Sequence, residues 1–498
     1  MSELGPIADP TDVLDGTSAG GRAISGGLLR VLAYAIGSLL AVGSTAVVAR
    51  YLGTEAFGDY ATVLSLSAIA LLTTDFGLAT LGVREYVART GEDRDHVMRV
   101  LIGLRMGLMG VGALGMLLFA TLAGFSGALW LGTLLAGLGL VVQAVPATYA
   151  VPLHATLRLG WVGGLDLVRQ ATQALVLVLL VVAGAGVAPL LGSLIPAGLV
   201  TLVVGASVAR GLAPLRPAFD WAQARQLLRM ALSFALATSV GAIYAYLAQV
   251  VVDLTVGSQE SGLFALSFRV FAVIIAVAII AVGSAYPILT RTAGTDETRF
   301  GYAASKLYEG MFLLGAGIAV AVGVGAPVIV ALLGGPEFED AVGILRLHGI
   351  AVAGSFLVAV GSFVLLAQHR FRALLWINLT TLGVSVVLTW AMASAFGGEG
   401  AAAAMCITEI GLATAFFVTL RRGGGEVGLA PRAAGAVLFS AAVAVAVAVG
   451  LTEVLGAGTG VAVVITAAAL SIFAACALAT GGVPGELTGP LRARLARR

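Results

Sequence analysis

The stretch AAGAVLFSAAVAVAVAVGL, residues 433–451, contains no charged side chain and is long enough to cross a bilayer as a helix. The rest of the chain has the same character. Of its 498 residues only 54 are charged (28 Lys and Arg, 26 Asp and Glu), and 59% are hydrophobic. A soluble domain could not hide so much apolar surface from water. The sequence therefore predicts an integral membrane protein.

Fourteen apolar stretches of this kind follow one another along the chain. Lipid offers the backbone no hydrogen-bond partners, and the short alternating segments of a β-barrel are absent, so the predicted fold is all-α. The predicted spans are 28–49, 60–83, 99–123, 128–150, 165–184, 187–209, 230–253, 262–288, 306–332, 344–367, 373–396, 400–420, 433–451 and 457–480. Only Ala185 and Gly186 separate the fifth span from the sixth, and without that hairpin the count would be thirteen.

The cationic residues predict the orientation of the spans. If every second connection is internal, 24 of the 28 Lys and Arg residues lie on internal segments or beside them. Such residues stay on the cytoplasmic side, so both termini are predicted in the cytoplasm and the number of spans is even. We expect a multi-pass protein of the cytoplasmic membrane, in contact with membrane lipids.

The predicted segments leave little room for soluble domains. They are a flexible cytosolic tail (1–27), an N-terminal bundle (28–209), a cytosolic linker (210–229), a C-terminal bundle (230–420), two further spans (433–480) and a basic cytosolic tail (481–498). No connection exceeds about 20 residues, which excludes a separate catalytic domain. The glycine runs lack the Gly-Lys-(Ser/Thr) of a nucleotide loop, the histidines lack zinc spacing, and no nucleic-acid footprint is present. We expect no enzyme activity, metal, nucleotide or nucleic acid.

An internal repeat divides the spans into bundles. LGTEAFGDYA (52–61) and VGSQESGLFA (256–265) share the pattern apolar-Gly-(Thr/Ser)-x3-Gly-x-aromatic-Ala at an offset of 204 residues. Six predicted helices separate the copies, so both halves point the same way across the membrane. Parallel repeats are a common plan of transporters, with the substrate path at the repeat interface. In the third span, Gly103 and Gly107 form a GxxxG pattern that predicts close helix–helix packing.

The first copy and its flanks carry a family resemblance. ARYLGTEAFGDY (49–60), TDFGL (74–78), Arg84-Glu85 and, in the second copy, GLFALSFR (262–269) resemble the polysaccharide transport family. Its members are prokaryotic flippases for lipid-linked oligosaccharides, in the superfamily that includes the multidrug and toxic compound extrusion transporters. The resemblance implies two six-helix bundles around a V-shaped cavity that opens alternately to either face, plus two C-terminal helices. It also implies a polyprenyl-pyrophosphate-linked oligosaccharide as cargo and polysaccharide assembly enzymes as partners.

Three arginines within or near the spans are candidates for binding such a headgroup: Arg30, Arg105 and Arg269. The planar guanidinium pairs with phosphate through two parallel hydrogen bonds and keeps its charge. Arg269 has the alternative of an ion pair with Asp253, and Arg105 could instead extend its side chain to the membrane surface.

Two intramembrane acids, Asp75 and Glu409, are candidates for ion coupling. Asp75 lies in the second span beside two threonines, so it could instead accept hydrogen bonds that fix helix packing. We expect no bound cofactor, with energy supplied by a proton or sodium gradient or by the membrane potential.

These patterns favour a flippase for lipid-linked oligosaccharides that works by alternating access. A multidrug or metabolite exporter of the same superfamily fold is the alternative, and it would favour an aromatic and acidic binding site. A membrane glycosyltransferase or polymerase would need catalytic acids in a substantial outer loop. The largest external acidic group is Glu337, Glu339 and Asp340, in a connection of about eleven residues.

Overall fold

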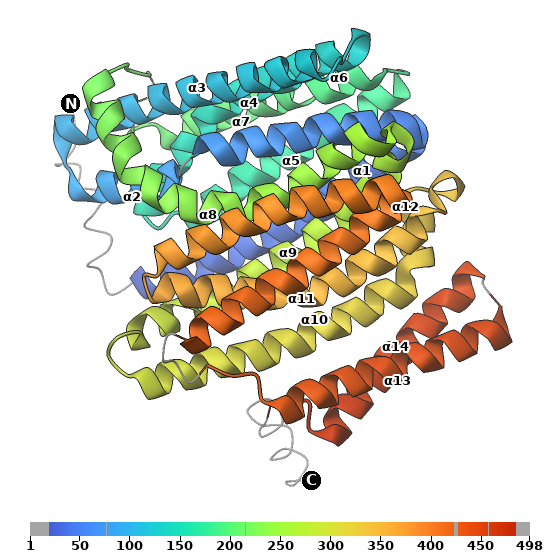
Figure 1. The fold of residues 1–498 in the computed structure, drawn as a ribbon. Helices are drawn as coiled ribbons and strands as arrows, with labels where there is room; N and C mark the ends of the chain where they lie inside the picture. The colour runs from blue at the N-terminus through green and yellow to red at the C-terminus, as the bar shows by residue number, and fades with distance from the viewer. Residues whose placement is uncertain (1–18, 76, 215, 423–426, 457, 485–498) are drawn as a thin grey trace. The chain divides into compact units, whose positions relative to one another are not determined.

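A computed structural model describes residues 19–75, 77–214, 216–422, 427–456 and 458–484, and all regular structure within them is helical (Figure 1). The helices are α1 (Ala19–Asp75), α2 (Leu78–Ala88), α3 (Gly91–Leu122), α4 (Gly127–Ala155), α5 (Leu159–Val182), α6 (Val187–Gly192), α7 (Leu194–Ala209), α8 (Trp221–Val256), α9 (Ser258–Thr292), α10 (Glu297–Leu333), a short 3₁₀ helix (Pro336–Phe338), α11 (Ala341–Ala367), α12 (Phe371–Arg422), α13 (Pro431–Leu455) and α14 (Thr459–Thr480).

The chain divides into two compact units. The first comprises Met1–Leu52 and Asp59–Tyr246, and the second comprises Gly53–Gly58 and Leu247–Arg498. Residues Gly53–Gly58, the middle of the first copy of the repeat, therefore belong to the second unit. The division between the units falls inside α8, whereas the sequence predicts a bundle boundary in the linker at 210–229.

In the first unit α4 is the central helix, and it packs against α2, α3, α6 and α7. The apolar core beside it includes Tyr86, Met98 and Leu101, which are almost completely buried. The Tyr86 hydroxyl donates a hydrogen bond to the Leu212 carbonyl at 2.7 Å, so the segment after α7 is fastened to α2. These contacts hold α2 and α3 in fixed register.

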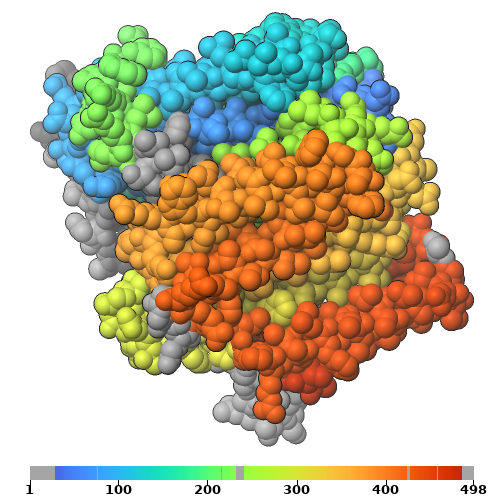
Figure 2. Space-filling view, viewed as in Figure 1, coloured from blue at the N-terminus to red at the C-terminus, as the bar shows by residue number. Residues whose placement is uncertain are grey.

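In the second unit α11 is the most enclosed span, packed between α9, α10 and α12. Helices α13 and α14 pack on each other and on α10 through a separate apolar cluster that includes Val320, Ile465 and Phe473. In Figure 2 the red surface of this pair lies along the yellow surface of α10. The last two helices are therefore an addition to one side of the second unit.

Eleven helices among the described residues are long and apolar enough to cross a membrane. Leu29–Ala88 covers the first two predicted spans, Phe371–Arg422 covers the eleventh and twelfth, and the shorter apolar helix Gly241–Val256 lies in the seventh. The prediction of an all-helical membrane protein is confirmed. The number of fourteen crossings and the orientation remain predictions.

Two predicted boundaries are wrong. Helix α1 begins at Ala19, inside the predicted flexible tail, because a helix that already exists extends at little cost and no proline stands in residues 19–27. The second span, predicted as one helix over 60–83, is interrupted: α1 ends at Asp75, and α2 begins after Gly77, which has the left-handed conformation (φ 65°, ψ 17°). Residues 1–18 and 485–498 lie outside the described part of the chain.

The two copies of the repeat have the same backbone and pack against each other within the second unit. Gly53 (φ 73°, ψ 180°) and Gly257 (φ 89°, ψ 173°) adopt a conformation essentially restricted to glycine. A Cβ on Gly58 would overlap the carbonyl oxygen of Ser258, and one on Gly262 would overlap that of Thr54. Since the contact is the same in both directions, the 204-residue repeat in the sequence is also a repeat in structure.

The GxxxG pattern in α3 has a different role from the predicted one. A Cβ on Gly103 would overlap the carbonyl oxygen of Ala218, in the segment before α8, whereas a Cβ on Gly107 would have no neighbour within 4 Å. The Ala218 N–H also donates to the Arg99 carbonyl of α3 at 2.9 Å. The prediction of a helix–helix contact is wrong here, because a backbone segment occupies the groove beside Gly103.

Candidate functional site

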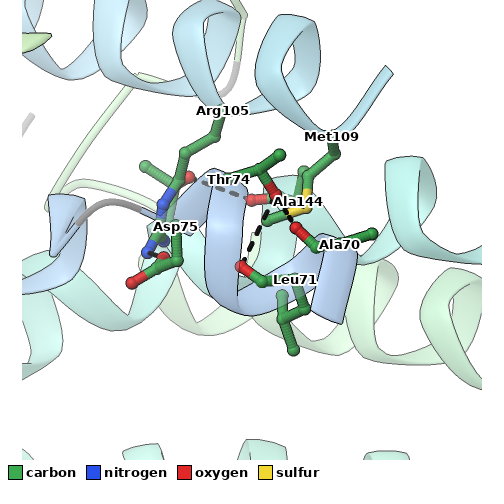
Figure 3. Close-up of polar contacts among 8 residues, drawn as sticks. Ala70, Leu71, Thr74, Asp75, Arg105, Met109 and Ala144 are labelled. Carbon is green, nitrogen blue, oxygen red and sulfur yellow. Dashed lines mark hydrogen bonds and ion pairs between the residues drawn. The ribbon is translucent and has the colours of Figure 1, made fainter. Parts of the chain in front are cut away.

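The interruption of the second span brings together two of the residues singled out in the sequence. Asp75 is the last residue of α1, and Arg105 lies on α3, within the same unit. Nη2 of Arg105 donates to Oδ1 of Asp75, and the two side chains form an ion pair (Figure 3). The sequence named both residues but assigned them separate roles.

The pair is positioned by packing one and two turns further along α3. The Thr74 hydroxyl donates to the Ala70 carbonyl at 2.6 Å and lies 3.1 Å from Sδ of Met109, one turn after Arg105 (Figure 3). A Cβ on Gly112 would lie 3.1 Å from the Thr74 methyl group. These contacts set the register of α3 against the end of α1.

Burial of the ion pair is unequal. The side chain of Arg105 is 3% exposed, whereas that of Asp75 is 33% exposed. Nε and Nη1 of Arg105 are buried and have no hydrogen-bond partner. Burying a cation in apolar surroundings costs free energy, and hydrogen bonds to all of its donors would offset that cost. The two unpartnered nitrogens of Arg105 leave part of the cost uncompensated. The alternative in which Arg105 extends to the membrane surface does not occur.

Arg30 belongs to a second charged group in the first unit. Its helix, α1, packs closely on α5, where a Cβ on Gly163 would lie 2.9 Å from Cα of Arg30. The Arg30 side chain is exposed, and its charge acts on Asp166 of α5 and His154 of α4. These partners were not predicted from the sequence, although Asp166 and Arg169, one turn apart within a predicted span, were a signal for them.

In the second unit Arg269 lies on α9, directly after a buried aromatic segment. Its Nε is buried without a hydrogen-bond partner. The ion pair between Arg269 and Asp253 stays a prediction. Ser267 and His348 of α11 are hydrogen-bonded at 2.6 Å between Oγ and Nδ1, and the His348 ring lies 5.0 Å from that of Phe264. This packing fixes the turn of α9 that carries Arg269.

Glu409 lies in the core of the second unit. It is 1% exposed, on α12, and its Cβ would lie 3.1 Å from a Cβ added to Gly354 of α11. The sequence correctly placed this carboxyl deep in a helical segment. Its role in ion coupling remains a prediction.

The site residues can supply cationic hydrogen-bond donors, from the arginines, and carboxylates that could bind a proton or a cation, from Asp75 and Glu409. Among the described residues, no group of three or more His, Cys, Asp and Glu side chains is arranged to hold a metal ion. Arg105 and Arg269 each have at least one buried donor that the protein does not use. An anion with several oxygen acceptors is the chemical complement of such groups.

Several solved structures have a similar fold. The structure of the lipid II flippase MurJ in an inward closed conformation has a TM-score of 0.72 to this chain at 13% identity, covering 90% of this chain and 98% of that one. An inward-facing multidrug resistance MATE family transporter of the MOP superfamily has a TM-score of 0.63 at 15% identity, covering 80% and 97%. A MOP superfamily transporter from Pyrococcus furiosus has a TM-score of 0.51 at 14% identity, covering 84% and 96%.

The sequence of the chain also identifies its family. No curated protein matches the chain. The family model described as polysaccharide biosynthesis protein matches residues 24–293, more than half of the chain, and this range contains both copies of the repeat together with Asp75, Arg105 and Arg269. The chain thus belongs to the polysaccharide biosynthesis protein family, and its fold is similar to those of the solved MurJ and MATE structures.

Proposed function

We propose that the protein moves a polyprenyl-pyrophosphate-linked oligosaccharide, or a related lipid-linked polysaccharide precursor, across the cytoplasmic membrane by alternating access. The observation that carries the proposal is the presence in each unit of an arginine with a buried nitrogen that has no partner in the protein: Arg105 and Arg269. Diphosphate offers several anionic oxygens, and a guanidinium binds them through parallel, charge-assisted hydrogen bonds. Family membership supports a lipid-linked sugar as the substrate.

The lipid tail needs no polar contacts, since it can stay in hydrocarbon while the headgroup crosses. Within this proposal both termini face the cytoplasm, and enzymes of polysaccharide assembly supply the substrate and use the product. A proton or sodium gradient, or the membrane potential, drives the cycle, with Asp75 and Glu409 as the candidate coupling groups.

The test is translocation of a fluorescent polyprenyl-pyrophosphate-linked oligosaccharide in proteoliposomes containing the full chain. For Arg269→Ala the rate is expected to fall by about tenfold or more, because a desolvated phosphate contact is lost. The rate of Arg269→Lys is expected to lie between those of the wild type and Arg269→Ala, since lysine keeps the charge but lacks the planar fork of donors.

Arg299→Ala is the matched control, because Arg299 lies in the same unit with its side chain 81% exposed. Its rate should equal that of the wild type. An unchanged rate for Arg269→Ala would remove this arginine from the mechanism. Transport of a cationic dye without transport of the diphosphate-linked sugar would instead identify a drug exporter.

A further inference from the structure

The end of α1 is an unfavourable place for Asp75. The last carbonyl groups of a helix have no partner within the helix, and the helix dipole places partial negative charge there. A carboxylate at this end is repelled unless a cation compensates it. Arg105 is that cation, so the ion pair stabilises the interruption as well as Asp75.

The matching position in the second copy of the repeat has neither the acid nor the interruption. At the 204-residue offset, Asp75 and Gly77 correspond to Ile279 and Ala281, and α9 runs without a break from Ser258 to Thr292. The fold therefore forms a helix here when the sequence allows one. The acid and the break occur together in the first copy only, which points to a role beyond packing.

The two partners differ in their freedom to move. Arg105 is fixed on α3, inside a long regular helix whose neighbouring turns pack on Thr74. Asp75 lies just before Gly77, which has the left-handed conformation, and glycine allows the backbone to change there at low cost. One third of the Asp75 side chain is accessible. Loss of the ion pair would therefore move the carboxylate, while the guanidinium stays in place.

The guanidinium has capacity for a second anion. Asp75 accepts from Nη2, whereas Nε and Nη1 are buried without partners. The planar guanidinium binds two phosphate oxygens either through Nε with Nη2 or through Nη1 with Nη2. Both pairs include the nitrogen that donates to Asp75, so a phosphate bound in either way competes with that carboxylate. One carboxylate thus leaves most of the guanidinium donors unused.

From this geometry we propose that Asp75 is a built-in competitor for the anionic headgroup: its carboxylate occupies Arg105 in the empty protein and is displaced when a diphosphate binds there. The inference rests on the proposed function, since it assigns the headgroup to this arginine. Displacement frees the end of α1 at Gly77, so occupancy of Arg105 by substrate is linked to movement of the helix junction between α1 and α2.

The experiment measures binding of farnesyl pyrophosphate to the purified full chain, with inorganic pyrophosphate and farnesol as further probes. Asp75→Asn removes the competing charge and is expected to tighten farnesyl pyrophosphate binding by about tenfold, the effect of removing one close charge pair. Arg105→Gln, alone or combined with Asp75→Asn, is expected to abolish that gain. Farnesol binding should not change, and inorganic pyrophosphate should show whether the headgroup alone suffices.

The matched control is Glu85→Gln. Glu85 forms an ion pair with Arg89 at 2.8 Å within α2, close in sequence to the same junction, and its loss should leave farnesyl pyrophosphate affinity unchanged. If Asp75→Asn does not fold, hydrogen exchange of the wild type still decides: added farnesyl pyrophosphate should increase exchange over residues 72–80. Slower or unaltered exchange there would contradict displacement.

Equal or weaker farnesyl pyrophosphate affinity in Asp75→Asn, or no binding to any variant, overturns the inference. Translocation of the lipid-linked sugar, measured separately, would then still support the proposed function. Conversely, tighter binding in Asp75→Asn without any translocation would keep the competitor and refute the flippase.

Discussion

The two copies of the repeat are alike at their glycine-containing turns, and the helices that follow them differ about twenty residues further along the chain. Gly53 and Gly257 have the same backbone conformation, and Gly58 and Gly262 face each other's helices in the same way. Beyond these turns, the first copy is interrupted at Asp75, whereas the second continues as one apolar helix through Ile279. The glycine-containing turns that the copies share are therefore structural, whereas the segment in which they differ has a charged residue, Asp75, in the first copy only.

Arg269 is a charged residue that is present in the second copy and absent from the first. Arg269 of the second copy corresponds to Ser65 of the first, a buried residue without charge. The buried arginines of the two halves thus lie on different helices, Arg105 on α3 and Arg269 on α9. Such a difference is expected when function, rather than packing, decides where a costly buried charge is tolerated.

The largest effect is expected where the copies are alike. Gly58→Ala or Gly262→Ala would drive a methyl group into a backbone carbonyl of the other copy, and neither backbone can yield without moving its helix. We expect each change to lower stability by about 3 kcal/mol, at the upper end of overpacking effects, and to depress the thermal unfolding temperature of the detergent-purified protein.

Gly110→Ala is the control for that measurement, because a Cβ at Gly110 meets no atom within 4 Å. It should be neutral or slightly stabilising, since alanine favours the helix. If Gly58→Ala and Gly110→Ala unfold at the same temperature, the face-to-face contact of the two copies is not part of the stable structure.

A smaller effect is expected where the copies differ. Gly77→Ala places a Cβ in the left-handed conformation, at a cost of about 1–2 kcal/mol, whereas Gly77→Asn should cost less because asparagine tolerates it. The thermal unfolding temperature should fall in the order wild type, Asn, Ala. Identical values for Asn and Ala would show that the left-handed residue is not what maintains the interruption.

The sequence predicted the framework of the protein better than its charged contacts. Apolar stretches identified the membrane helices, and short motifs identified the family. The interruption at Gly77 was missed because hydropathy stays high on both sides of it. The pairing of Asp75 with Arg105 was missed because it depends on the register of α3, which Met109 and Gly112 set through contacts distant in sequence.

The smallest expected effect is one of pH on a helix N-terminus. The helices that follow the compared segments, α3 in the first half and α10 in the second, begin differently. In the second copy, Asp296 caps α10 by accepting from the Arg299 N–H at 2.9 Å. In the first copy, no side-chain hydrogen bond caps α3. Instead His96 of α3 lies 3.3 Å from Asp220, which also accepts from the Ala222 and Gln223 N–H groups and so caps α8.

These contacts give the first copy a dependence on pH. The hydrogen bond from the Gln223 backbone, followed by that from His96, lowers the pKa of Asp220 below its ordinary value of 3.8. A lowered pKa in the folded state means that the ionised form stabilises the fold at neutral pH, and that this contribution is lost as the pH falls through the folded-state pKa. Protonation should therefore loosen the first turn of α8 in acid.

Hydrogen-exchange protection of residues 221–224 provides the measurement, taken between about pH 5 and pH 2, a range that includes the ordinary pKa of aspartate and values below it. Protection should decrease toward the acid end in the wild type, whereas Asp220→Asn should remove most of that dependence. Asp296→Asn, at the start of α10, should leave residues 221–224 unaffected. An equal response of these residues to both substitutions would mean that acid acts on the whole protein rather than on the Asp220 cap.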